Sequence, residues 1–106
     1  MVPHDVTMAG TFYEQLKRWI QMDEKSLQAE QRLVITFSNQ GDPVQVTGIE
    51  FHNPNMITLY GLDRAGKPVI VLAHMASVAL LLRHAEAPSQ QEPRRIGFRG
   101  DDWPSE

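Results

Sequence analysis

The chain has 106 residues, of which 42% are hydrophobic and 22% charged, and its formal net charge is −3. This length suits one modest domain with a small core, for which self-association would add buried surface. The acidic balance argues against binding nucleic acid through bulk charge, and the absence of cysteine excludes disulfides and thiolate metal sites. Neither a leader-like N-terminus nor a membrane-length apolar run is found, so we expect a cytoplasmic protein that stays outside the membrane.

The N-terminal part of the sequence predicts an arm followed by a helix. Residues 1–10 show no periodicity, so we expect them to form a flexible arm. Thr11 and Glu14 have the spacing of a capping box, which marks a helix start. A helix over about 12–22, with a weaker continuation to about 31, is predicted by apolar residues at spacings of three and four: Phe12, Leu16, Trp19, Ile20 and Leu27. Asp23 interrupts this stripe and suits the cap of a second short helix.

From Leu33 onward the hydrophobic period changes to two. Four short runs rich in β-branched and aromatic residues, LVITFS, VQVTGIEF, MITLYGL and VIVL, are separated by segments rich in Asn, Asp, Gly and Pro. This pattern predicts an antiparallel meander. Gly48 weakens the second strand unless it supports a bulge or bend, so we expect a strongly curved sheet.

The segment LAHMASVALLLRHAEA, residues 72–87, fits two structures. Its alanines and leucines favour a helix, in which residues 75, 78, 79 and 82 would share one face. Alternatively, HMASV forms a bend and the chain returns as a strand, with Leu80 and Leu82 on one side and Leu81 and Arg83 on the other. Both faces of that strand are largely apolar, which an exposed edge would not tolerate without a partner. We favour the strand and keep the helix as the alternative.

A helix followed by a curved meander with this bend resembles the Sm-like (LSm) family and, within it, the bacterial Hfq RNA chaperones. The stretch GIEFHNPNMITL, Gly48 to Leu59, is similar to the first family motif, and AHMAS, Ala73 to Ser77, to the second motif of the bacterial branch. The resemblance covers about residues 12–83. It implies a mainly β fold with an N-terminal α-helix, a small and strongly bent five-stranded antiparallel barrel over residues 11–86. It also implies a homo-oligomeric ring in which the last strand pairs with the fourth strand of the next subunit.

The resemblance further implies that single-stranded RNA is bound by four residues: Asn53, Asn55, Met56 and His74. Met56 lies where the bacterial proteins place an aromatic residue that stacks on a base, and a thioether stacks less specifically than a ring. Two departures weaken the pocket, because the segment His52 to Asn55 replaces the loop aspartate and Ala73 replaces the lysine before the histidine. Each residue also has a structural alternative: turn formation for the two asparagines, core filling for Met56 and a bend contact for His74.

The leading expectation is therefore a non-catalytic, ring-forming Sm-like protein that binds single-stranded RNA in a regulatory or chaperone role. The alternative is a homo-oligomeric protein-interaction module that has lost the RNA pocket. A third, weaker possibility is a small α+β adaptor without a ring. The four histidines lack metal-binding motifs, and Ser77 near His74 lacks a third catalytic group, so we expect no enzyme activity, no metal and no cofactor.

Residues 87–106 hold three of the seven prolines and few apolar residues. This composition predicts a disordered C-terminal tail whose removal leaves folding intact. The stretch RRIGFR, residues 94–99, is the exception, because it could form a short docking patch.

Overall fold

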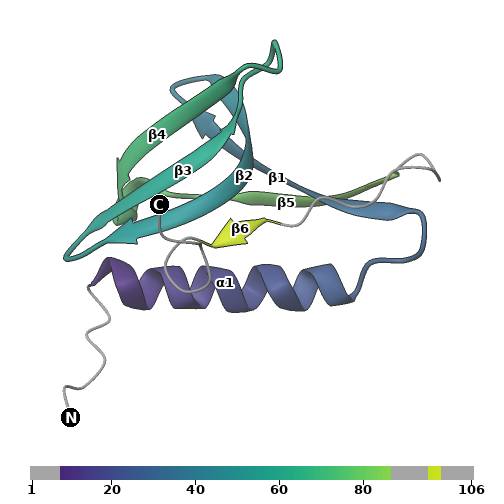
Figure 1. The fold of residues 1–106 in the computed structure, drawn as a ribbon, viewed down its shortest axis with the longest axis horizontal. Helices are drawn as coiled ribbons and strands as arrows, with labels where there is room; N and C mark the ends of the chain where they lie inside the picture. Colours follow the sequence, from purple (N-terminus) through teal and green to yellow (C-terminus); the bar gives the residue numbers. More distant parts are fainter. Residues whose placement is uncertain (1–7, 87–95, 99–106) are drawn as a thin grey trace.

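The computed structural model describes residues 8–86 and 96–98, and Figure 1 shows one helix beneath a bent sheet. Within these ranges, no helix is long and apolar enough to cross a membrane. The elements in chain order are α1 (Ala9–Lys25), β1 (Gln31–Asn39), β2 (Asp42–His52), β3 (Met56–Leu62), β4 (Pro68–His74), the 3-10 turn η1 (Met75–Ser77), β5 (Leu81–Glu86) and β6 (Gly97–Phe98).

Five strands form an antiparallel sheet in the order β4-β3-β2-β1-β5. The sheet is not closed, because β4 and β5 lie at its two ends and do not pair with each other in the described chain. The predicted mainly β fold with an N-terminal helix and a five-stranded antiparallel sheet is confirmed at this level.

Two glycines allow the sheet to bend where β2 and β3 approach each other. The register of the β2–β3 pair shifts between Val46 and Gly48, which is the bulge that the glycine in this strand predicts. Gly61, opposite Val46, has less space for a side chain than Gly48 has. A Cβ there would overlap the Gln45 carbonyl oxygen and lie 2.7 Å from Val44 Cγ1, so only glycine fits without movement.

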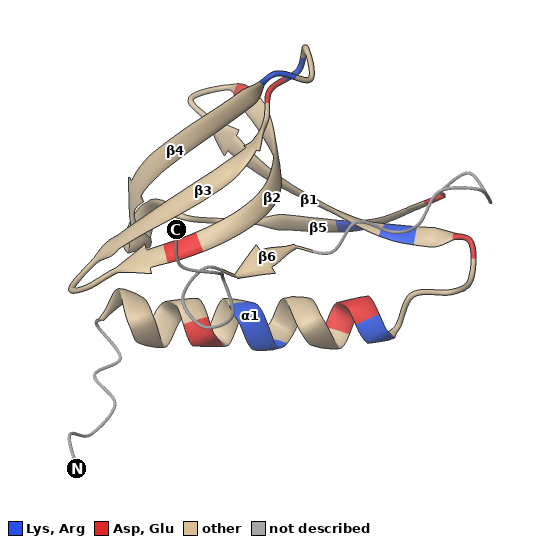
Figure 2. Cartoon of the chain, viewed as in Figure 1, with Lys and Arg blue, Asp and Glu red and all other residues tan. Residues whose placement is uncertain are grey.

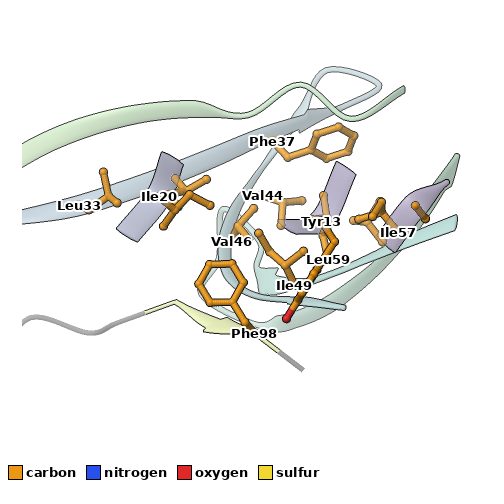
Figure 3. Packing of buried hydrophobic residues seen from close by; sticks show 13 residues of the cluster. Tyr13, Ile20, Leu33, Phe37, Val44, Val46, Ile49, Ile57, Leu59 and Phe98 are labelled. Atoms are coloured by element: carbon orange, nitrogen blue, oxygen red, sulfur yellow. The ribbon is translucent and has the colours of Figure 1, made fainter. Parts of the chain in front are cut away.

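The core lies between α1 and the concave face of the sheet (Figure 3). The helix contributes Ala9, Tyr13 and Ile20, all at most 1% exposed. Alternate strand residues complete the core, as the period of two predicts: Leu33, Ile35, Phe37, Val44, Val46, Ile49, Ile57, Leu59 and Val71.

The helix begins in a different way from the predicted capping box. Met8 occupies the N-cap position without a side-chain cap, so Thr11 and Glu14 lie inside the helix. The first turn is instead satisfied by the β2–β3 turn: Ala9 N–H donates to Pro54 O at 2.6 Å and Gly10 N–H to Asn53 Oδ1 at 2.9 Å. Residues 9 and 10 therefore belong to the helix and not to the predicted arm, and residues 1–7 lie outside the described chain.

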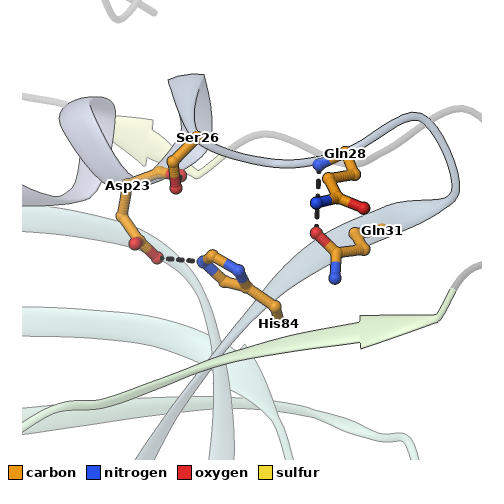
Figure 4. A network of polar contacts seen from close by, with 5 residues as sticks. All are labelled: Asp23, Ser26, Gln28, Gln31 and His84. Atoms are coloured by element: carbon orange, nitrogen blue, oxygen red, sulfur yellow. Dashed lines mark hydrogen bonds and ion pairs between the residues drawn. The ribbon is translucent and has the colours of Figure 1, made fainter.

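The helix is continuous to Lys25, which corrects the prediction that Asp23 caps a second helix. Asp23 lies in the last turns of α1 and reaches across to β5, where its Oδ2 is 2.9 Å from His84 Nε2 (Figure 4). Ser26 ends the helix, with its hydroxyl donating to Asp23 O at 2.7 Å. The contact between Asp23 and His84 joins the end of the helix to the edge strand.

Residues 75–86 adopt the favoured bend and strand and not the alternative helix. η1 turns the chain after β4, and β5 pairs with β1 from Leu81 opposite Thr36 to Glu86 opposite Gln31. Propensity favoured a helix here, but the backbone of this segment instead forms a six-residue antiparallel ladder with β1.

Part of the predicted tail belongs to the fold. Gly97 and Phe98 form β6, which pairs in parallel with Gly48 and Ile49 of β2. Phe98 is only 8% exposed, and its ring packs edge-on against Tyr13 with centroids 5.9 Å apart. Gly97 and Phe98 thus dock on the fold, as the short docking patch expected within residues 94–99 would. Residues 87–95 and 99–106 lie outside the described chain.

Candidate functional site

The β2–β3 turn and the bend after β4 lie side by side at one corner of the sheet. Met75 N–H donates to Asn55 O at 2.8 Å, which ties the bend to the turn. Met56 begins β3 directly opposite His74, the last residue of β4. The structure therefore brings together Asn55, Met56 and His74, residues that lie up to 19 positions apart in the sequence.

Asn53 lies in the same turn, but its side chain has a structural role. Its Oδ1 accepts the hydrogen bond from Gly10 N–H at the helix N-terminus. An amide oxygen used in this way satisfies one of the first backbone N–H groups of α1. Among the four predicted RNA-binding residues, Asn53 thus has its side-chain oxygen engaged within the fold.

His74 has a fixed ring orientation. Its Nδ1 accepts a hydrogen bond from Ala76 N–H at 3.0 Å, as the bend alternative predicts. When the ring is neutral, its proton must then lie on Nε2, which can donate to a ligand. The bend contact and a ligand contact are compatible, because they use different nitrogens.

Met56 is half-buried and is not part of the core. The register places it in a row across three strands, with His52 on β2 and His74 on β4 as its neighbours. Ile57 and Leu59 face the core, so Met56 lies on the opposite face of the sheet. The core-filling alternative is therefore wrong for this residue.

A polar network beside this row was not predicted. The Tyr60 hydroxyl donates to Glu50 Oε1 at 2.8 Å, and His52 Nε2 lies 3.3 Å from the same oxygen. The carboxylate thereby holds His52 next to Met56. The period of two places all three on the outer face of β2 and β3, but sequence alone could not show that they share one oxygen.

The corner carries little formal charge. Neither β3 nor β4 contains a Lys, Arg, Asp or Glu, and the nearest charged neighbour in the network is Glu50. Figure 2 shows the charges instead on α1, on β1 and β5, and in the turn between β3 and β4. The corner thus offers a thioether and two imidazoles with hydrogen-bonding atoms, which suit a planar and polar but uncharged group.

The two edge strands form the second notable surface. On β4, Ile70 and Leu72 are 65% and 70% exposed, and on β5 Leu81 is 49% exposed. Edge strands usually carry charges that prevent further pairing, whereas β4 carries none. An uncharged edge with exposed aliphatic side chains is typical of a strand that pairs with another chain.

Within the described chain, no group of three His, Cys, Asp or Glu side chains is arranged to hold a metal ion. Comparison with protein-family models, with curated proteins and with solved structures finds no match to this chain.

Proposed function

We propose that this protein is a ring-forming, non-catalytic Sm-like protein that binds single-stranded RNA in a regulatory or chaperone role. The observation that carries the proposal is the corner where Asn55, Met56 and His74 meet, because the Sm-like resemblance implies a base-binding site built from these positions. A base would stack on the Met56 thioether, while His74 Nε2 and the Asn55 side chain would contact its edge.

The ring is supported by the strand order. Among the described residues, β4 and β5 each lack a partner strand on one side, so β4 of one copy can continue the sheet of the next through β5. Such a contact joins two different surfaces and closes into a ring when the rotation between copies is suitable. Pairing would cover Ile70, Leu72 and Leu81, and the bent sheet would gain the closed environment expected of an Sm-like barrel.

Leu72→Asp tests the ring without disturbing the core, because this side chain is 70% exposed in the single chain. A carboxylate in the seam should weaken association by about 1.5–3 kcal/mol per interface, the value of the lost aliphatic burial. Sedimentation should then show a shift toward smaller species with unchanged circular dichroism. Ser38→Asp, at an exposed position on β1 outside the seam, is the matched control. An unchanged mass for Leu72→Asp, or a monomeric wild-type protein, would contradict the ring.

Fluorescence anisotropy with short uridine- or adenine-rich strands tests RNA binding. Met56→Ala and His74→Ala should each weaken binding by about 1–3 kcal/mol, the range for losing a stacked base. Met22→Ala, an exposed methionine on α1, should have no effect. Binding should depend weakly on salt, because the corner has no cation to release counterions from phosphates. An intact oligomer that binds no RNA at low salt would contradict the proposed RNA binding.

Two observations favour the alternative, a homo-oligomeric protein-interaction module. The oxygen of Asn53 is engaged at the helix, and the described corner lacks a lysine or arginine for phosphate. The ring surfaces do not depend on either feature. Failure of RNA binding with a stable ring would therefore promote the interaction module over the RNA-binding protein.

A further inference from the structure

β6 lies between α1 and the half of β2 that follows its bulge (Figure 1), and we call the site that it occupies the groove. β1 pairs with β2 only up to Gln45, opposite Thr36, and beyond this point the same side of β2 is available to another strand. β6 occupies it through two residue pairs, Gly48 with Gly97 and Ile49 with Phe98. Figure 1 shows β6 lying between the sheet and the helix. This is the arrangement of a peptide that adds a strand to a sheet edge.

The groove holds the aromatic side chain of Phe98 among other aromatic groups. Phe98 contacts the ring of Tyr13 edge-on, and Lys17 Nζ lies 5.9 Å from the Phe98 centroid. Tyr13 in turn lies 4.8 Å, centroid to centroid, from Phe51. Beside Phe98 and Ile96 a hollow of about 640 Å³ continues between the helix end and β1, lined by Leu27, Leu33 and glutamine side chains.

The segment in the groove is short, yet the groove needs an occupant. Two residue pairs form a very short strand, and short peripheral elements open more readily than the core. Tyr13 and Ile49 are fully buried with β6 in place, and departure of β6 would expose part of their surface. Exchange of one occupant for another therefore costs much less than leaving the groove empty.

The position of β5 puts the groove of a second copy within reach of this segment. The segment is connected to β5, the edge to which we assign the neighbouring subunit, and ten residue steps from Glu86 to Ile96 span up to about 35 Å. β5 lies two strands from its own β2. Across a seam between β5 and the neighbour's β4, it lies three strands from the neighbour's β2. At the usual spacing between strands, the lateral separation is about 10 Å within one copy and about 15 Å between copies.

We propose that the groove between α1 and β2 is a strand-addition site that exchanges residues 96–98 between neighbouring copies. The inference rests on the ring proposed above. Both occupants have the same sequence and both are tethered within reach, so their effective concentrations at the groove are similar. The exchanged segment links neighbouring subunits through Phe98, in addition to the seam between β4 and β5.

Engineered disulfides test the exchange, because the chain has no cysteine of its own. Gly48 and Gly97 are direct partners on neighbouring strands, and a Cβ at Gly48 would meet its nearest atom at 3.5 Å, an ordinary contact. Neighbouring strands lie within the Cα separation that a disulfide requires. Full-length Gly48→Cys and Gly97→Cys proteins are unfolded together, refolded and oxidised mildly, and the linked peptides are identified by mass spectrometry. Gly48→Cys mixed with Ser38→Cys is the control, and the double variant Gly48→Cys/Gly97→Cys reports the contact within one chain.

We expect the mixed proteins to form the 48–97 intermolecular link with a yield on the order of a tenth or more of the yield in the double variant. The control mixture should give only background. The exchange is overturned if the double variant links efficiently while the mixture gives no more than the control. In that outcome an oligomeric mass in sedimentation leaves the ring standing, whereas a monomeric mass overturns both proposals. Failure of the double variant to form the link would overturn the groove itself.

Discussion

Replacing Phe98 by alanine tests whether the β6 segment contributes to the stability of the fold. Burying a phenylalanine contributes about 1.5–3 kcal/mol, and an aromatic pair such as that with Tyr13 adds about 0.5–1.5 kcal/mol. The ring is 8% exposed and adjoins an open hollow, so water can fill the space that it leaves and little cavity penalty is added. We therefore expect Phe98→Ala to lower the free energy of unfolding by about 2–4 kcal/mol.

Urea unfolding followed by circular dichroism measures this loss, at one protein concentration because association also contributes to stability. Met22→Ala is the matched control, since it truncates a large apolar side chain that is 56% exposed on α1. Its effect should stay within about 0.5 kcal/mol. If Phe98→Ala costs no more than this control, residues 96–98 do not support the core, and the original expectation of a dispensable tail stands.

Four further substitutions probe the sheet and the helix. Gly61→Ala should lower the free energy of unfolding in urea by about 1–3 kcal/mol, because the added Cβ overlaps the backbone of β2. Gly48→Ala meets only ordinary contacts and should lower this free energy by about 1 kcal/mol or less. Equal losses for the two variants would contradict this steric reasoning. Tyr60→Phe should cost about 1 kcal/mol for the lost hydrogen bond to Glu50, and no change would show that the bond is not formed in solution. Asp23→Asn should lower the free energy of unfolding by at most about 1 kcal/mol, because the pair with His84 is about one-third exposed. The difference from wild type should be smaller at high salt, which screens the pair.

The strands and their order of appearance were predictable because the sheet is covered on one face only. Such a sheet leaves a period of two in the sequence, and turn residues mark each break. The bulge at Gly48 was predictable for a related reason, because glycine weakens a regular strand. The restriction at Gly61 was not predictable, since it depends on how closely β2 approaches β3.

The errors concern contacts between distant segments. The capping box at Thr11 is a local pattern, but the β2–β3 turn supplies the acceptors for the helix start from more than 40 residues away. Asp23 suits a helix cap by type and instead contacts β5. Phe98 lies in a stretch too polar to fold alone, and it is ordered because α1 and β2 already form a groove with an aromatic floor. In each case tertiary contacts outweigh the local preference.

The resemblance led us to expect Asn55, Met56 and His74 near one another, and the geometry of the corner where they meet required the structure. The turn that presents Asn55 and Met56 is held from two sides: its Asn53 and Pro54 oxygens accept from the start of α1, and its Asn55 oxygen accepts from Met75 in the bend. The turn therefore connects the helix to the bend that carries His74. A site held in this way loses little conformational entropy on binding, which favours useful affinity for an uncharged base without a strong contribution from phosphate contacts. In the function proposed above, rigidity and stacking would replace the electrostatic attraction on which most nucleic-acid sites depend.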